Sequence, residues 1–320
     1  MKLELYLQNS TTGIIYDISD IAGQIEVTSS ILGDAGKLSC ILYKDPNNLL
    51  QISNGSRVSF IVDGVGIFYG YVFMIGTDAE QNYKITCYDQ MRYLKNSDII
   101  TTTDMTASDI FAKVCKDYNL KYEIKAPTSY IPEPYIHDKK TLYSIIERGM
   151  NYASINDKKM YYIKDNFGTL VWSELGLEKT NIQLGEGSLL LGYKYEKSID
   201  SDTYNQIKMY KEDKKAGKRD IWIVKDSNSI TKWGILQMLN KADDELNEAQ
   251  IKQMAEDYLK VKNRETEKLT LQANGIKELV AGKGIKFVLE REKIDKWMWI
   301  ITAKHTFTKY LHTMELEVEI

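Results

Sequence analysis

The sequence has 320 residues, of which 43% are hydrophobic and 27% are charged, and it contains 22 Tyr but only 4 Pro. These proportions exclude a disordered chain and predict two or three folded domains. The formal net charge is −3 and the pI is about 5.8, which argues against a general nucleic-acid-binding protein, because such proteins are basic.

Membrane, secretion and disulfide signals are all missing from the sequence. No run of about 18 apolar residues is present, so we expect no membrane span. Glu4 interrupts the apolar start MKLELYLQ, so we expect no secretion signal and therefore synthesis in the cytoplasm. The three cysteines, Cys40, Cys87 and Cys115, are far apart, which argues against a disulfide framework and a cysteine zinc site.

Residues 1–98 have the pattern of a domain built from short strands. Leu3, Leu5 and Leu7 alternate with polar residues, which is the period of a half-buried strand. Turn signals such as Asp63-Gly64 separate the further strands that we predict at 24–31, 37–43, 57–63, 67–77 and 83–88. Short strands at this spacing predict a small antiparallel barrel or sandwich.

Residues 99–180 change to a mixed pattern that predicts a small α+β domain. Thr106 and Asp109 have the spacing of a capping box, and apolar residues on one helical face follow them. We predict a second amphipathic helix at 141–153 and then a hairpin of two strands, 159–163 and 169–173.

Residues 181–320 return to strands and include one long helix. Strands are predicted at 189–196, 206–211 and 221–225, the helix at 243–263, and three or four strands after it. The overall prediction is a mainly β chain. It has two related antiparallel β-barrel-like domains, 1–98 and 181–320, with the α+β domain between them.

A weak duplication connects the two β-domains. The first carries KLSCILY, GSRVSFIV, IFYGYVFMI and NYKITCYD, and the second carries EKLTLQA, GKGIKFVL, WMWIITAKHTF and HTMELEVEI in the same order. In this match Gly55–Val62 lies over Gly282–Leu289. Any two four-stranded antiparallel units look alike, so the pattern leaves coincidence open. A true duplication would give a trimer six similar units around a ring.

No catalytic, cofactor or metal motif is found, so we expect a protein that is not an enzyme and needs no cofactor. The sequence holds only three histidines. If Thr308-Lys309 is a two-residue hairpin loop, His305 faces His312 across two strands. A zinc ion needs a third or fourth ligand, which only Glu315 or Glu317 could supply, so hydrogen bonding within the β-domain is the favoured interpretation.

Several segments resemble one family of phage tail proteins. They are TAKHTFTKYLHTMELEVEI at the C-terminus, DSNSITKWGILQ before the long helix, and GIFYGYV followed by ITCYDQMRYLKNSD in the first half. In these motifs and in their order along the chain, residues 57–320 resemble the XkdQ/YqbQ family. The motif residues that carry the resemblance are Tyr88, Asp89, Leu94, Trp233, Gly234, His305, Phe307, His312 and Met314.

The resemblance implies a structural baseplate hub of a contractile phage tail or of an R-type or PBSX-type bacteriocin. In such hubs three chains form a ring that adapts a six-fold tail tube to a three-fold spike and nucleates tube assembly. The implied partners are the chain itself as a homotrimer, the tail tube protein, the central spike protein, and other baseplate or LysM-type tail proteins. No membrane and no specific nucleic acid is implied. The implied location is the bacterial cytoplasm and then the baseplate of the particle.

Trp297 and Trp299 share a strand face and are candidates for interface anchors, although core packing would explain them equally well. Two other functions stay open. One is a glycan-binding or receptor-binding tail module, in which Tyr130, Tyr135 and Tyr143 would stack on sugars. The other is a tail-associated cell-wall hydrolase, against which the scarcity of histidines argues.

Overall fold

The computed structural model describes residues 1–44, 49–200, 202–213, 218–242 and 246–319. The chain is mainly β, as predicted, and divides into two compact units. Unit 1 comprises residues 1–194 and 270–320, and unit 2 comprises residues 195–269. None of the helices in the described ranges has the length and apolar character that a membrane span requires.

One sheet of 13 strands runs through unit 1. Its first strands are β1 (Leu3–Gln8), β2 (Ile15–Asp17), β3 (Ala22–Ser30), β4 (Lys37–Leu42), β5 (Arg57–Val62), β6 (Val65–Thr77) and β7 (Tyr83–Tyr88). The others are β13 (Lys179–Gly185), β14 (Leu190–Ser198), β18 (Thr266–Asn274), β19 (Gly284–Leu289), β20 (Ile294–Phe307) and β21 (His312–Glu319). The strand order is β14-β18-β21-β20-β3-β4-β7-β6-β5-β1-β2, with β19 paired to β20 and β13 to β19.

Alternation along the strands builds the core of this sheet. In β4 the side chains of Leu38, Cys40 and Leu42 are buried, and in β18 those of Leu269, Leu271 and Ala273 are buried. The residues between them point away from these cores, which is the two-residue period predicted for half-buried strands.

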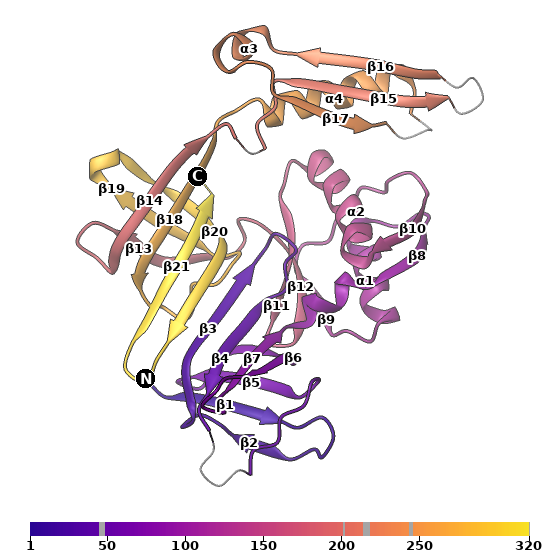
Figure 1. The fold of residues 1–320 in the computed structure, drawn as a ribbon. Helices are drawn as coiled ribbons and strands as arrows, with labels where there is room; N and C mark the ends of the chain where they lie inside the picture. Colours follow the sequence, from indigo (N-terminus) through magenta and orange to yellow (C-terminus); the bar gives the residue numbers. More distant parts are fainter. Residues whose placement is uncertain (45–48, 201, 214–217, 243–245, 320) are drawn as a thin grey trace. The chain divides into compact units, whose positions relative to one another are not determined.

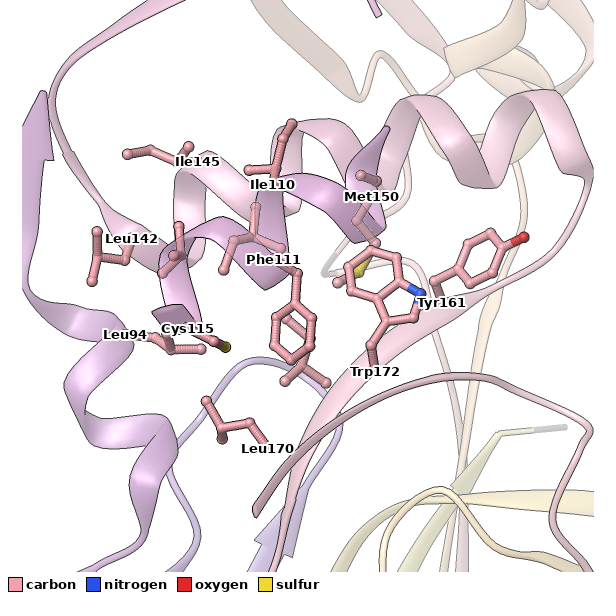
Figure 2. Close-up of a cluster of buried hydrophobic side chains, with 14 of the residues drawn as sticks. Leu94, Ile110, Phe111, Cys115, Leu142, Ile145, Met150, Tyr161, Leu170 and Trp172 are labelled. Atoms are coloured by element: carbon pink, nitrogen blue, oxygen red, sulfur yellow. The ribbon is translucent and has the colours of Figure 1, made fainter. Parts of the chain in front are cut away.

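The α+β part of unit 1 has its own core (Figure 2). Its elements are η1 (Gln90–Lys95), β8 (Ser97–Thr102), α1 (Ala107–Asp117), β9 (Tyr122–Ile124), β10 (Tyr135–Thr141), α2 (Leu142–Asp157), β11 (Tyr161–Asn166) and β12 (Thr169–Glu174). The predicted capping box of Thr106 and Asp109 begins α1. Trp172 lies between Phe111 and Tyr161, and its indole N–H donates to the carbonyl oxygen of Ala126 at 2.9 Å.

Unit 2 is a three-stranded sheet with one long helix against it (Figure 1). It contains β15 (Gln206–Asp213), β16 (Lys218–Lys225), α3 (Ser227–Trp233), β17 (Gln237–Lys241) and α4 (Glu248–Lys262), in the strand order β16-β15-β17. The predicted helix 243–263 is α4, and residues 243–245 of that range lie outside the described residues.

The long helix packs on the strands of unit 2. Ile251 and Ala255 of α4 are buried against Ile207 and Met209 of β15. The stretch predicted as one domain, 181–320, therefore contains an inserted compact unit, because these apolar side chains form a separate core. The division of unit 1 into domains 1–98, 99–180 and the last β-domain stays a prediction.

Candidate assembly interface

The two halves of the large sheet have the same strand order. In the first half the order is β4-β7-β6-β5, and in the second it is β18-β21-β20-β19. The chain order is also the same, because in both sets the sheet order is first, fourth, third and second strand along the chain. The predicted duplication is therefore present in the topology, and we call the two sets repeat 1 and repeat 2.

Register supports the same match residue by residue. Tyr71 of β6 pairs with Arg57 on one side and Tyr88 on the other. Trp299 of β20 pairs with Gly284 and Glu319 in the same way. A register shift follows each of these positions, between Val72 and Met74 in repeat 1 and between Ile300 and Thr302 in repeat 2. Bulges at equivalent positions favour a duplication over coincidence, because a bulge is a specific local insertion. The shift between Phe60 and Ile61 in repeat 1 has no counterpart in the pairing of β19 with β20.

Backbone hydrogen bonds outside the strands repeat as well. The N–H of Gly55 donates to the Val72 carbonyl at 2.7 Å, and the N–H of Gly282 donates to the Ile300 carbonyl at 2.8 Å. These bonds match Gly55 to Gly282, as the sequence alignment predicted.

The strand before each repeat also has a counterpart. The N–H of Tyr43 donates to the Ile21 carbonyl at 2.8 Å, and the N–H of Asn274 donates to the Leu189 carbonyl at 3.0 Å. These bonds match β3 to β14, since β3 pairs with β4 and β14 with β18. Along the chain, most of unit 2 therefore lies between β14 and β18, where repeat 1 has only the short connection 31–36 between β3 and β4.

A direct strand pairing joins the two repeats within the chain, and we call it the internal junction. The second half of β20 pairs antiparallel with β3, from Thr302 opposite Ser30 to Phe307 opposite Ile25 (Figure 1). Lys304 and Glu26 form an ion pair at 3.1 Å across it.

Phe307 of the internal junction packs into the core of repeat 1. Its side chain is fully buried among residues of that core. The ring meets Phe60 edge-on, with 5.1 Å between the centroids. An aromatic residue of repeat 2 thus completes the hydrophobic packing of repeat 1.

The counterpart of this junction is open in the described chain. By the register match, residues 74–77 of β6 correspond to residues 302–305 of β20. On this side of β6 the pairing with β5 ends at Tyr71, and the described strands pair β6 only with β5 and β7. Met74 is 58% exposed. At the other end of the sheet, β14 is the terminal strand. The chain therefore presents two strand edges, each matching one side of the internal junction.

The histidine pair lies beside the internal junction. The prediction that His305 faces His312 is wrong, because Thr308 pairs with Leu311 and the loop lies one residue further along; His305 therefore faces Met314. The imidazoles still meet diagonally, with 2.9 Å between His305 Nδ1 and His312 Nε2.

Neutral imidazoles fit this arrangement. His305 Nε2 donates to the Leu279 carbonyl at 2.9 Å, so its Nδ1 accepts from His312. Burial lowers the pKa of both rings, that of His312 to about 4. The pair therefore fixes the connection between β18 and β19. Among the described residues no three His, Cys, Asp or Glu side chains converge to hold a metal ion.

Asp89, a predicted motif residue, lies at the start of η1, next to Tyr88. Its two carboxylate oxygens accept from the N–H of Met91 at 3.0 Å and of Gly36 at 2.9 Å. Burial raises the pKa of Asp89, and the nearby Asp165 raises it further. Burial also raises the pKa of Asp165 to about 7, and sequence reasoning missed this second carboxyl group.

The remaining motif residues have packing or capping positions. Leu94 and Met314 are buried. Trp233 ends α3, and Gly234 follows it with φ +76, a conformation that suits glycine. The carbonyl oxygen of Gly234 accepts from Asn205 Nδ2 at 2.7 Å. His305, Phe307 and His312 thus contact one another, whereas the other motif residues are spread over both units.

Trp297 and Trp299 lie on one face of β20, as predicted, and correspond to Tyr69 and Tyr71 of β6. Trp297 is 39% exposed. The ammonium group of Lys179 lies 5.0 Å from the ring centre of Trp297 and 6.0 Å from that of Trp299. Their role as interface anchors stays a prediction.

The tyrosines considered for glycan stacking have protein neighbours. The Arg148 guanidinium carbon lies 3.6 Å from the ring centre of Tyr135, and Tyr130 stacks on Tyr152. Tyr143 lies against Gly33, where an added Cβ would meet its ring. Arg148 also lies 5.4 Å from the ring centre of Tyr152, so Tyr130 and Tyr135 belong to one stack of protein groups, and their role in glycan binding stays a prediction.

A partly buried ion cluster that sequence reasoning missed connects the α+β part to repeat 2. The Glu178 carboxylate contacts Lys125 at 2.6 Å and both Lys164 and Lys283 at 3.0 Å. Burial would raise the pKa of Glu178, but the hydrogen bond from Lys125 and the charge of Lys164 overcome this effect and lower it to about 2. Its partners come from three distant segments, so no local motif signals the cluster.

Comparisons with known proteins identify the family of the chain. A family model described as YQBQ-like matches residues 25–319. The uncharacterized protein YqbQ of Bacillus subtilis is 29% identical over 284 residues, which is 87% of this chain and 85% of the relative. The phage-like element PBSX protein XkdQ of the same organism is 28% identical over 277 residues, covering 84% and 82%.

A solved structure gives the same fold. The 43 kDa tail protein of prophage MuSo2 from Shewanella oneidensis superposes with a TM-score of 0.73 at 14% identity, covering 98% of both chains. The fold of this chain is therefore that of a phage tail protein.

Proposed function

The chain belongs to the YQBQ-like family, and from this premise we propose that it is the hub of a contractile-tail baseplate. Copies of the chain join into a closed ring through their open strand edges. The ring consists of three chains and therefore six repeats. One face meets the six-fold tail tube and the other the three-fold central spike. The role is mechanical and uses no catalytic residue.

The internal junction is the observation that carries this proposal. It pairs the second half of β20 with β3. The equivalent pairing between repeats of different chains joins residues 74–77 of β6 to β14 of the next copy. Such a contact is head-to-tail, so it generates a ring when the rotation closes. It also removes the exposed edges that promote uncontrolled association of β-proteins.

The hydrogen bonds of the junction indicate which backbone groups of β6 point toward its open edge. The Ile301 carbonyl accepts from the Ile31 N–H at 3.0 Å. Backbone groups alternate along an antiparallel strand, so those of Ala303 also face β3. The register match makes Ile75 the counterpart of Ala303. The N–H of Ile75 therefore faces the open edge and pairs with the next copy.

The partners follow from the two symmetries of such a ring. The six repeats match a hexameric tube, whereas the α+β parts occur three times and match a trimeric spike. Neighbouring baseplate proteins, including LysM-type tail proteins, contact the outside. Synthesis takes place in the bacterial cytoplasm, and the chain then becomes part of the phage tail or tail-like particle.

The test is native mass spectrometry with negative-stain imaging of the full chain, alone and mixed with the tube and spike proteins of its particle. We expect a three-chain species with a six-lobed ring around a central hole. Ile75→Pro removes the outward N–H and prevents the ring. The matched control Ile75→Val keeps this N–H group and is expected to form the ring.

A second variant tests the same edge in case Ile75→Pro does not fold. Met74→Lys places a charge on the exposed edge and is expected to weaken ring formation while the circular dichroism spectrum stays that of the wild type. The proposal fails if the chain remains a monomer in the presence of both partners. It also fails if folded Ile75→Pro still assembles.

A further inference from the structure

The three-stranded sheet of unit 2 has two faces of different character. Ile207 and Met209 of β15 point to one face, where α4 covers them. The alternate residues point to the other face, which we call the outer face. By the register of β16-β15-β17, Lys208 lies between Ile223 and Leu239 in one row.

Large aliphatic side chains are exposed on the outer face. Ile221 is 51% exposed, Ile223 52% and Leu239 56%. A sheet face that meets only water normally carries polar side chains at such positions. Three aliphatic residues on the two strands that flank β15 therefore indicate a surface that a partner covers.

The charged side chains of the outer face are mostly positive. Its alternate positions carry four cations and one carboxylate, which gives a net charge of +3, whereas the whole chain has −3. They are Lys208, Glu212, Arg219, Lys225 and Lys241. Glu212 lies 3.0 Å from Arg219 and 3.8 Å from Lys241, so the only carboxylate among them is already neutralised.

We propose that the outer face of unit 2 binds an acidic protein surface with aliphatic residues at its centre. The aliphatic residues of the two surfaces would bury each other, and the cations would meet carboxylates at the rim. A second copy of the same face is disfavoured because like charges would meet. Nucleic acid is disfavoured because its binding rests on phosphate contacts and base stacking, whereas the exposed apolar side chains of this face are aliphatic. Its aromatic residue, Tyr210, is half-buried with the Arg219 guanidinium 5.7 Å from the ring centre.

This inference goes beyond the ring and does not depend on it, because none of these residues belongs to the strands of the junction. It adds a second kind of contact to the chain. The large sheet joins copies of the chain to one another, and unit 2 binds a different protein.

The test uses a synthetic amphipathic helical peptide with leucines on one side and glutamates on the other. A second peptide with lysines in place of the glutamates is the comparison. Fluorescence anisotropy with the full chain is expected to show at least about tenfold tighter binding of the acidic peptide, and added salt is expected to weaken it.

Two variants identify the surface that binds. Ile223→Glu replaces an exposed side chain with a charge of the wrong sign for an acidic partner and is expected to weaken binding by about tenfold or more. Lys260→Glu is the control, because Lys260 is an exposed residue of α4, the helix that covers the opposite face of the sheet, and this change is expected to leave binding within about twofold. Ring formation, measured in parallel, is expected to be the same in both variants, so this result is separate from the test of the ring.

Three outcomes would overturn the proposal. The first is equal binding of the acidic and the basic peptide. The second is unchanged binding after Ile223→Glu. The third is tighter binding of duplex DNA, of phosphatidylglycerol vesicles or of a second copy of the chain than of the acidic peptide, because this would assign the face to another class of partner.

Discussion

Replacing Phe307 with alanine is expected to loosen the connection between the two repeats. The ring is fully buried and lies 5.1 Å from Phe60, and it stacks on His312 with 4.0 Å between centroids. Truncating a buried phenylalanine removes its burial and leaves a cavity, which costs about 3–5 kcal/mol. About 0.5–1.5 kcal/mol of this loss belongs to the edge-on pair with Phe60.

The measurement combines urea unfolding with hydrogen exchange. Since 1.4 kcal/mol is a factor of about ten, a loss of about 4 kcal/mol accelerates exchange through opening of the junction by roughly a thousandfold. The effect is expected in β3 and in the second half of β20. The strands of unit 2 are expected to exchange as before, because they have their own core.

A double-mutant cycle with Phe60→Ala isolates the contact across the junction. The coupling energy is expected at about 0.5–1.5 kcal/mol. Tyr310→Ala in the same hairpin is the control, because Tyr310 is 89% exposed and its loss is expected to change stability by at most about 0.5 kcal/mol. If Phe307→Ala costs less than about 1 kcal/mol, or if the coupling is zero, the packing argument for the junction is refuted.

Three further substitutions test the buried polar groups. The folded-state pKa of Asp165 is raised to about 7, so its stabilising contribution is lost as the pH rises from about 4 to 7; Asp165→Asn is expected to be more stable than the wild type at pH 8 but not at pH 4, as urea midpoints will show. The pKa of His312 is lowered to about 4, so the wild type loses stability as the pH falls from about 6.5 to 4, and His312→Gln is expected to flatten that part of the profile. Glu178→Gln leaves buried Lys164 without its counter-charge and is expected to cost about 3–5 kcal/mol by denaturation, whereas Asp117→Asn in an exposed pair is expected to cost at most about 0.5 kcal/mol.

Local patterns predicted most of the regular elements. The strands at 57–63 and 83–88 were located to within one residue because alternation and turn residues agree there. The helix from 107 was located because its capping box is a local signal. The short α3 and the strands β2, β8, β9, β10, β13 and β17 were missed, since packing by distant segments and not their own sequence determines them.

The arrangement of the site required three-dimensional information. The sequence alignment of Gly55–Val62 with Gly282–Leu289 agrees with the register, yet it could not show that β20 pairs with β3, which is more than 270 residues away. The histidine loop was wrong by one residue, because the Thr308 hydroxyl accepts from the Leu311 N–H and shifts the turn. Unit 2 was not recognised, because its strands alternate like those of the large sheet.

The position of unit 2 in the chain has a consequence for how such proteins can change. The ends of this unit lie side by side, where the Thr266 hydroxyl donates to the Ser198 carbonyl at 3.0 Å. Closing a long insertion between two neighbouring points costs little entropy, about 0.6 kcal/mol for each doubling of its length. A different folded unit with adjacent ends could therefore replace this one without altering the pairing of β14 with β18. One lineage could acquire new binding partners at this point while the large sheet stays the same.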